Sequence, residues 1–143
     1  MTNFQESLNE LMIENNLNRL NLAKIIGVSS TAINGYFNYN SFPSIATAIK
    51  IANTFKCSLD YLFGLTDNKT TSYEIVDNWE YNFLDNLYKL IKLSNTSIAS
   101  TMKQLNIKEN TYYNWRKGTI PSTANILTVA NFFDVSIDYL LFG

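Results

Sequence analysis

The sequence predicts an all-α protein made of two similar five-helix units, and three observations support this fold class. Residues 41–63 align without gaps onto residues 119–141 at an offset of 78, and 10 of the 23 positions are identical. A background of roughly 6% would give about one identity, so an internal repeat is present. In both copies apolar residues recur at spacings of three and four, which is typical of amphipathic helices. Ser or Asn residues also stand at matched positions, where they favour helix starts.

The first helix of each copy is predicted from its apolar face. The apolar residues correspond at an offset of 79: Phe4, Leu8 and Leu11 in the first copy, Phe83, Leu87 and Leu90 in the second. Because Trp79 precedes Phe83 by four residues, this helix of the second copy is expected to begin near Asp77 or Asn78. The change of offset places one extra residue within Asn38–Asn40, and a length change of this kind indicates a loop.

The later helices are predicted from short polar residues that can accept hydrogen bonds from free amides at a helix N-terminus. These caps are Asn18 and Ser97, Ser44 and Ser122, and Ser58 and Ser136. Asp60 and Asp138 then fall in the first turn of a helix, where a carboxylate is favoured by the positive end of the dipole. We therefore interpret the repeated Ser-x-Asp-Tyr-Leu motif as structural and expect no catalytic residue in it.

Composition excludes several classes of function. The chain has 143 residues, no His and one Cys, so it cannot build a Cys/His zinc site, a Ser-His-Asp triad or an intramolecular disulfide. We expect no enzyme, no metal and no cofactor. No segment resembles a signal peptide or approaches the roughly 20 apolar residues that span a bilayer, and a cytoplasmic protein is expected. Cys57 aligns with Val135 and is expected to be a small buried residue.

The repeat divides the chain into a first domain at residues 1–66, an acidic and aromatic connection at residues 67–82, and a second domain at residues 83–143. The formal net charge is −1. The first domain has four basic and four acidic residues, the connection one and four, and the second domain six and four. A DNA-binding protein usually carries a positive balance, and here only the second domain does.

The segment LAKIIGVSSTAINGYF (residues 22–37), followed by a helix that starts at Pro-Ser, resembles the lambda-repressor-like, or XRE-type, helix-turn-helix family of phage Cro and repressor proteins. The second copy resembles it through LNIKENTYYNWRKGTIPS (residues 105–122). The resemblance implies two tandem helix-turn-helix domains. In the first copy Gly27 would provide the turn and Ser29 the cap of the third helix. The second copy has Asn106 and Lys108 there, and Asn tolerates the left-handed turn conformation.

In this family the third helix enters the major groove of double-stranded DNA. By position, the resemblance implies that the first copy presents Ser30, Thr31, Asn34 and Gly35 to bases, and Arg19, Ser29 and Asn38 to phosphates. The second copy would present Glu109, Asn110, Tyr113 and Asn114 to bases, and Lys108, Arg116 and Lys117 to phosphates. The cations near the second recognition helix predict that DNA binding depends mainly on the second copy and on assembly.

The leading interpretation is a sequence-specific transcriptional regulator, a repressor of the phage or mobile-element type, that binds operator DNA as a homodimer. Either both copies contact DNA, or one binds DNA while the other dimerises. The alternative is a protein-binding antagonist or adaptor that docks on another regulator or enzyme through its first domain. Tyr36 and Phe42 are expected in the core. A possible protein interface comprises Phe37, Tyr39, Phe132, Leu141 and Phe142.

Overall fold

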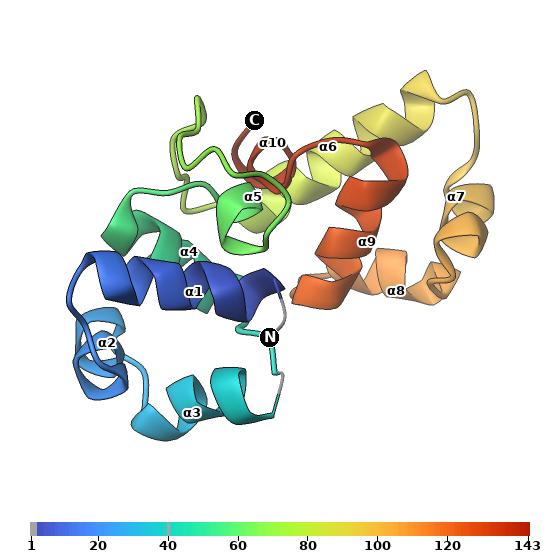
Figure 1. Ribbon diagram of the computed structural model, residues 1–143. Coiled ribbons are helices and arrows are strands. Elements are labelled where there is room, and N and C mark those ends of the chain that lie inside the picture. The colour runs from blue at the N-terminus through green and yellow to red at the C-terminus, as the bar shows by residue number, and fades with distance from the viewer. Residues whose placement is uncertain (1–2, 40) are drawn as a thin grey trace. The chain divides into compact units, whose positions relative to one another are not determined.

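The computed structural model describes residues 3–39 and 41–143, and within these ranges every regular element is a helix (Figure 1). The predicted all-α fold class is therefore confirmed. The chain divides into two compact units, Met1–Ser72 and Tyr73–Gly143. Among the described residues, no helix is long and apolar enough to cross a membrane.

Each unit contains five helices in the described residues. The first unit has α1 (Asn3–Glu14), α2 (Arg19–Ile26), α3 (Ser30–Asn38), α4 (Ile45–Phe55) and α5 (Leu59–Leu62). The second unit has α6 (Trp79–Leu93), α7 (Ile98–Leu105), α8 (Glu109–Arg116), α9 (Thr123–Phe133) and α10 (Ile137–Phe142). Of the loop predicted to carry the extra residue, Asn38 ends α3 and Tyr39 follows it, whereas Asn40 lies outside the described residues.

The helix starts are set by the predicted caps. The side chains of Asn18, Ser44, Ser58, Ser97, Ser122 and Ser136 each accept a hydrogen bond from the amide three residues ahead. Asn78 is the N-cap residue of α6, which confirms the expected start of the second copy's first helix, although its side chain makes no capping bond. Asp60 and Asp138 lie in the first turns of α5 and α10, as predicted.

The two units share more than their helix order, because corresponding residues adopt the same conformations and contacts. Three pairs of residues related by the repeat have left-handed backbones: Asn16 and Asn95, Gly27 and Asn106, Lys56 and Asp134. The rings of Phe4 and Tyr36 meet edge to face at 5.6 Å, and those of the corresponding Phe83 and Trp115 at 5.4 Å. The internal repeat is thus a repeat of backbone geometry as well as of sequence.

One buried polar contact is also repeated. The Ser7 hydroxyl donates to the carbonyl of Tyr61 at 2.9 Å in the first unit. At the corresponding position, the Asn86 side-chain amide donates to the carbonyl of Tyr139 at 3.1 Å. Both bonds tie the first helix of a unit to its last helix, so the short α5 and α10 are held by polar contacts as well as by packing.

Each core is formed by the apolar faces of its five helices. Fully buried side chains include Leu8, Leu22, Ile33, Ile51 and Leu59 in the first unit, and Phe83, Leu87, Met102, Ile126 and Leu140 in the second. Tyr36 and Cys57 are buried as expected. The prediction that Phe42 lies in the core is wrong, because this residue is 49% exposed. Its ring touches those of Phe4 and Phe63 but covers the core from outside.

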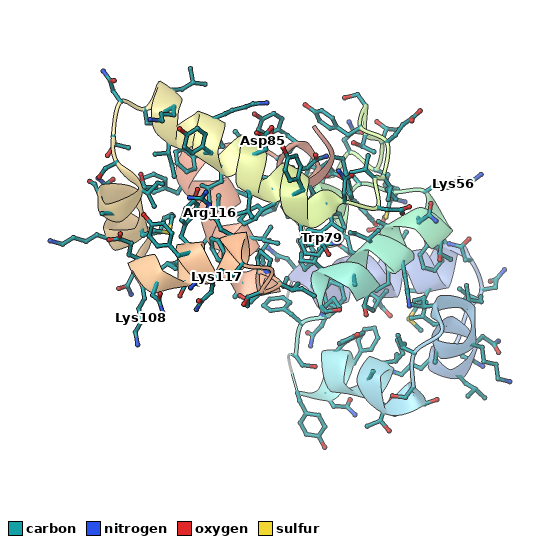
Figure 2. All side chains as sticks on the ribbon, turned by 180° about the vertical axis from the view of Figure 1, so that it is seen from behind. Lys56, Trp79, Asp85, Lys108, Arg116 and Lys117 are labelled. Carbon is teal, nitrogen blue, oxygen red and sulfur yellow. The ribbon has the colours of Figure 1, made fainter. Side chains whose placement is uncertain are left out.

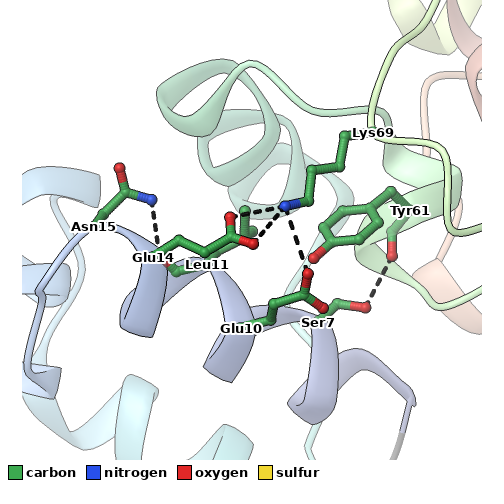
Figure 3. A network of polar contacts seen from close by, with 7 residues as sticks. All are labelled: Ser7, Glu10, Leu11, Glu14, Asn15, Tyr61 and Lys69. Carbon is green, nitrogen blue, oxygen red and sulfur yellow. Dashed lines mark hydrogen bonds and ion pairs between the residues drawn. The ribbon is translucent and has the colours of Figure 1, made fainter.

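The start of the predicted connection belongs structurally to the first unit. The Lys69 ammonium lies 2.7 Å from both carboxylate oxygens of Glu14 and 3.5 Å from Glu10 on α1 (Figure 3). The Lys69 carbonyl accepts a bond from the Ser58 amide at 2.8 Å. Lys69 lowers the pKa of the Glu14 carboxyl through this hydrogen-bonded pair. These contacts explain why the boundary between the units falls after Ser72.

Candidate nucleic-acid interface

In the first unit, a left-handed turn joins α2 to α3 and sets the direction of α3. Gly27 has φ 80° and leads to Ser29, whose hydroxyl accepts from the amide of Ala32 at 3.1 Å. Ile33 and Tyr36 then face the core. The opposite side, beginning with Ser30 and Thr31, is exposed. An exposed, polar helix start is the part of a recognition helix that approaches base edges.

Arg19, the first residue of α2, crosses the outer surface of α3. Its Nη1 donates to Oδ1 of Asn34 at 3.1 Å and to Oδ1 of Asn38 at 3.4 Å. Its guanidinium also lies 4.6 Å from the centre of the Phe37 ring. The structure therefore brings together three predicted DNA contacts and one predicted interface residue. Because a guanidinium has five N–H donors, Arg19 retains donors for a phosphate while it orients the Asn34 amide.

Gln5 on α1 was not predicted from the sequence as a site residue, although it holds the end of α3 by hydrogen bonds. Its side-chain amide donates to the carbonyl of Tyr36 at 2.6 Å and to that of Phe37 at 3.3 Å. Carbonyls near the end of a helix lack partners within the helix, so this contact satisfies them and fixes α3 against α1. The signal in the sequence is weak: Gln5 is a polar residue next to the apolar Phe4, and Ser7 is a second buried polar residue on the same helix.

In the second unit, α7 and α8 are joined by a turn of the same kind. Asn106 has φ 58°, which confirms that an asparagine can take the place of glycine here. Lys108 occupies the N-cap position with an extended backbone, and its side chain makes no capping bond. Tyr112 and Trp115 anchor α8 in the core. Burial raises the pKa of the Tyr112 hydroxyl above its ordinary value.

The outer surface of α8 carries the predicted DNA contacts. Lys108, Glu109, Asn110, Tyr113, Arg116 and Lys117 are exposed, and Asn114 is half-buried. The Tyr113 ring packs edge-on against Tyr112 at 5.3 Å, which limits its freedom. Figure 2 shows Lys108 at the start of α8 and Arg116 and Lys117 at its end, so the cations flank the polar surface between them.

The charge near each helix pair is more positive than the whole chain. Residues 19–38 contain two basic residues and no acidic ones, and residues 98–117 contain four basic residues and one acidic one. The local balances are therefore +2 and +3, although the chain as a whole carries −1. Apart from Glu109 on α8, the acidic residues lie elsewhere: on α1, on α5, in the connection, on α6 and around α10. This separation permits both helix pairs to approach a polyanion.

The predicted protein interface is only partly exposed. Tyr39 is 81% exposed and Phe132 is 43% exposed, whereas Phe37 is half-buried beneath Arg19. The prediction that Leu141 and Phe142 form part of a protein interface is wrong, because they are 0% and 9% exposed. The last helix is short and turns these side chains into the core, so they offer no surface to a partner.

Comparison with known proteins adds one finding for the first unit. A family model described as helix-turn-helix matches residues 8–62, which run from α1 to the end of α5. No curated protein and no solved structure gave a significant match. The matched segment contains the left-handed turn, the capped α3 and Arg19, so the family match and the local geometry agree.

Proposed function

We propose that the chain is a transcriptional repressor of the XRE, or lambda-repressor-like, class that binds operator DNA as a homodimer, and the match of residues 8–62 to a helix-turn-helix family model supports this proposal. The second unit acts as a second helix-turn-helix domain. Each third helix, α3 and α8, enters a major groove. The chain needs no cofactor and catalyses no reaction in this role.

One observation carries the proposal: in both units, the helix after a left-handed turn buries one side and exposes a polar start. In α3 the exposed start is Ser29–Thr31, and in α8 it is Lys108–Asn110. The hydroxyl groups and the Asn and Glu side chains of these segments can form hydrogen bonds with base edges. Cations stand beside both helices, where they can neutralise phosphates.

The second unit contributes more of the electrostatic affinity in this proposal. Lys108, Arg116 and Lys117 are exposed around α8 and can each contact a phosphate. With Arg19, one chain offers about four such contacts, and each releases about 0.9 counterion. The logarithm of the binding constant is then expected to fall with the logarithm of salt concentration with a slope of about −3.6 per chain, and about twice that for a dimer.

The proposal is tested by fluorescence anisotropy with random-sequence and AT-rich duplexes between about 50 and 200 mM salt. In the double variant Arg116→Gln, Lys117→Gln, we expect weaker binding to every duplex and a slope that is smaller by about 1.8 per chain. The matched control is Lys50→Gln with Lys89→Gln, which removes the same charge from α4 and α6. This control is expected to change the slope much less.

An unchanged affinity in the α8 variant would contradict the role of the second unit, and an effect equal to that of the control would mean that only net charge matters. Sedimentation of the protein with a single operator-length duplex gives the stoichiometry. Two chains per duplex support the homodimer, whereas a single chain that protects two adjacent half-sites would contradict it.

The alternative function, an antagonist that docks on another regulator or enzyme, is favoured by one observation. Tyr39 is largely exposed at the end of α3, close in the chain to the aromatic Phe37 and Phe42. Exposed tyrosines are common in protein interfaces. The absence of any shift of duplex DNA at micromolar protein and low salt would favour this function over the repressor.

A further inference from the structure

A groove opens in the second unit between α6 and α8, beside the predicted DNA surface. Its volume is about 480 Å³, and its lining consists of Tyr81, Leu84, Asp85, Tyr88, Tyr112 and Arg116. The α6 residues recur at spacings of three, four and seven, so they share one face of that helix. Tyr112 and Arg116 are four residues apart on α8. Figure 2 labels Asp85 and Arg116 on these two helices.

Aromatic side chains supply most of the wall. Tyr81 and Tyr88 are 67% and 45% exposed although both are large and partly apolar, and Leu84 lies between them in the sequence. Tyr112 is buried and contributes the part of the lining that comes from within the core. A volume of this size, bounded by aromatic residues with a few polar groups, is typical of a site for a small organic molecule.

The charges in and beside the groove are not balanced. The Asp85 carboxylate is already paired with the Lys89 ammonium at 2.9 Å, and the Lys92 ammonium lies 5.3 Å from the centre of the Tyr88 ring. Within the described part of the chain, no acceptor or carboxylate is paired with the Arg116 guanidinium. The remaining charge that faces a ligand is therefore positive.

This arrangement selects among ligand classes. A planar aromatic group can stack on tyrosine rings, and a carboxylate can form two parallel hydrogen bonds with a guanidinium. A neutral apolar ligand would leave Arg116 covered and unpaired. A cationic ligand would meet Arg116 and Lys92, while the carboxylate of Asp85 is engaged by Lys89.

We propose that the groove between α6 and α8 is a binding site for a small planar aromatic carboxylate, with Tyr81 and Tyr88 contacting the ring and Arg116 holding the carboxylate. The site belongs to the second unit alone. It shares Arg116 with the proposed phosphate contacts and includes none of the proposed contacts with bases, and its occupancy is measured without DNA.

The experiment is a titration of the full-length, ¹⁵N-labelled chain followed by two-dimensional NMR. The probes are indole-3-acetate, its neutral analogue indole-3-acetamide and the cation tryptamine, which share one ring system. We expect indole-3-acetate to shift amide signals of α6 and α8 and to bind roughly tenfold more tightly than the amide. Tryptamine is expected to bind more weakly than both.

Three variants assign the contacts. Tyr88→Ala should weaken binding of indole-3-acetate at least about fivefold, because a stacking face is lost. Arg116→Gln should remove the preference for the acid over the amide. Leu93→Ala removes an exposed apolar side chain from the same helix outside the groove and should leave the affinity unchanged. Preserved signal dispersion shows that each variant is folded.

Several outcomes would overturn the proposal. Equal affinity for the three probes would show that no charge is recognised, and tighter binding of tryptamine would reverse the assigned polarity. Shifts confined to helices other than α6 and α8 would place the ligand elsewhere. A preference for the acid that persists in Arg116→Gln would remove the guanidinium from the site.

Discussion

The side-chain amide of Asn86 holds the last helix of the second unit, and replacing it should destabilise that unit. Asn86 is 4% exposed and donates to three carbonyls, those of Tyr139 at 3.1 Å, Leu140 at 3.1 Å and Gly143 at 3.3 Å. The Tyr139 carbonyl also accepts from the Gly143 amide at 2.8 Å, so it keeps a partner in Asn86→Ala. The buried carbonyl of Leu140 is the main group left without a donor.

An unsatisfied buried carbonyl costs about 1–3 kcal/mol, and we expect Asn86→Ala to lower the free energy of unfolding by about 2 kcal/mol. For a unit of this size the melting temperature should fall by roughly 8–16 °C. Asn86→Asp conserves the shape but faces the three carbonyls with a carboxylate. It should therefore be more destabilising than the alanine variant at pH 7.

Intrinsic fluorescence is a selective assay because both tryptophans, Trp79 and Trp115, are buried in the second unit. Urea unfolding followed by this signal reports on the unit that contains Asn86. Asn131→Ala, at an exposed position of α9, is the matched control and should change stability by less than about 0.5 kcal/mol. A loss in Asn86→Ala no larger than that in Asn131→Ala would contradict the prediction, because the hydrogen bonds donated by Asn86 would then contribute nothing to stability.

Local contacts at Lys108, Lys69 and Gly27 can each be tested by a single substitution. Lys108→Ser should supply the cap that α8 lacks and stabilise the second unit by about 1 kcal/mol in urea unfolding, while the lost cation weakens DNA binding; no gain in stability would contradict this. Lys69→Gln should destabilise the first unit between pH 4.5 and pH 10.5, where both partners of the Lys69–Glu14 ion pair are charged. The pKa of Glu14 is lowered, so the stabilisation by the ion pair is lost as the pH falls through that pKa. The pKa of Lys69 is raised, so the stabilisation is lost as the pH rises through that second pKa. Circular dichroism during urea unfolding at pH 3 and pH 7 tests this, and an equal difference at both values would count against the ion pair. Gly27→Ala should lower the free energy of unfolding of the first unit by roughly 1 kcal/mol, because an alanine is strained at a φ of +80°. No steric clash adds to this loss, since nothing lies within 4 Å of the added carbon. Thermal unfolding followed by circular dichroism measures the effect.

The features that could be predicted from the sequence are those that depend on neighbouring residues. Ser29, Ser58 and Ser136 cap helices because a hydroxyl reaches an amide three residues ahead, and this needs no knowledge of the rest of the chain. The left-handed turn at Asn106 is local in the same sense. The repeat itself extended these predictions from one unit to the other.

The features that could not be predicted depend on contacts between distant residues. Gln5 and Asn86 find their acceptors 31 and 53 residues away, and no local pattern names those carbonyls. The side chains of Leu141 and Phe142 look exposed in a chain-end sequence but are buried by the helices packed around α10. The assignment of individual residues to bases or phosphates depends on the geometry of a complex with DNA, so it stays a prediction.

The contacts of Lys69 bear on where a fragment that contains the first unit should end. A fragment that ends at residue 66, where the predicted first domain ends, would lose the carbonyl that accepts from the Ser58 amide and the ammonium that pairs with Glu14. A fragment that extends to residue 72 keeps both. The predicted first domain and the compact first unit are thus different lengths of chain, and a fragment cut at the predicted boundary would lack two contacts that the compact unit makes.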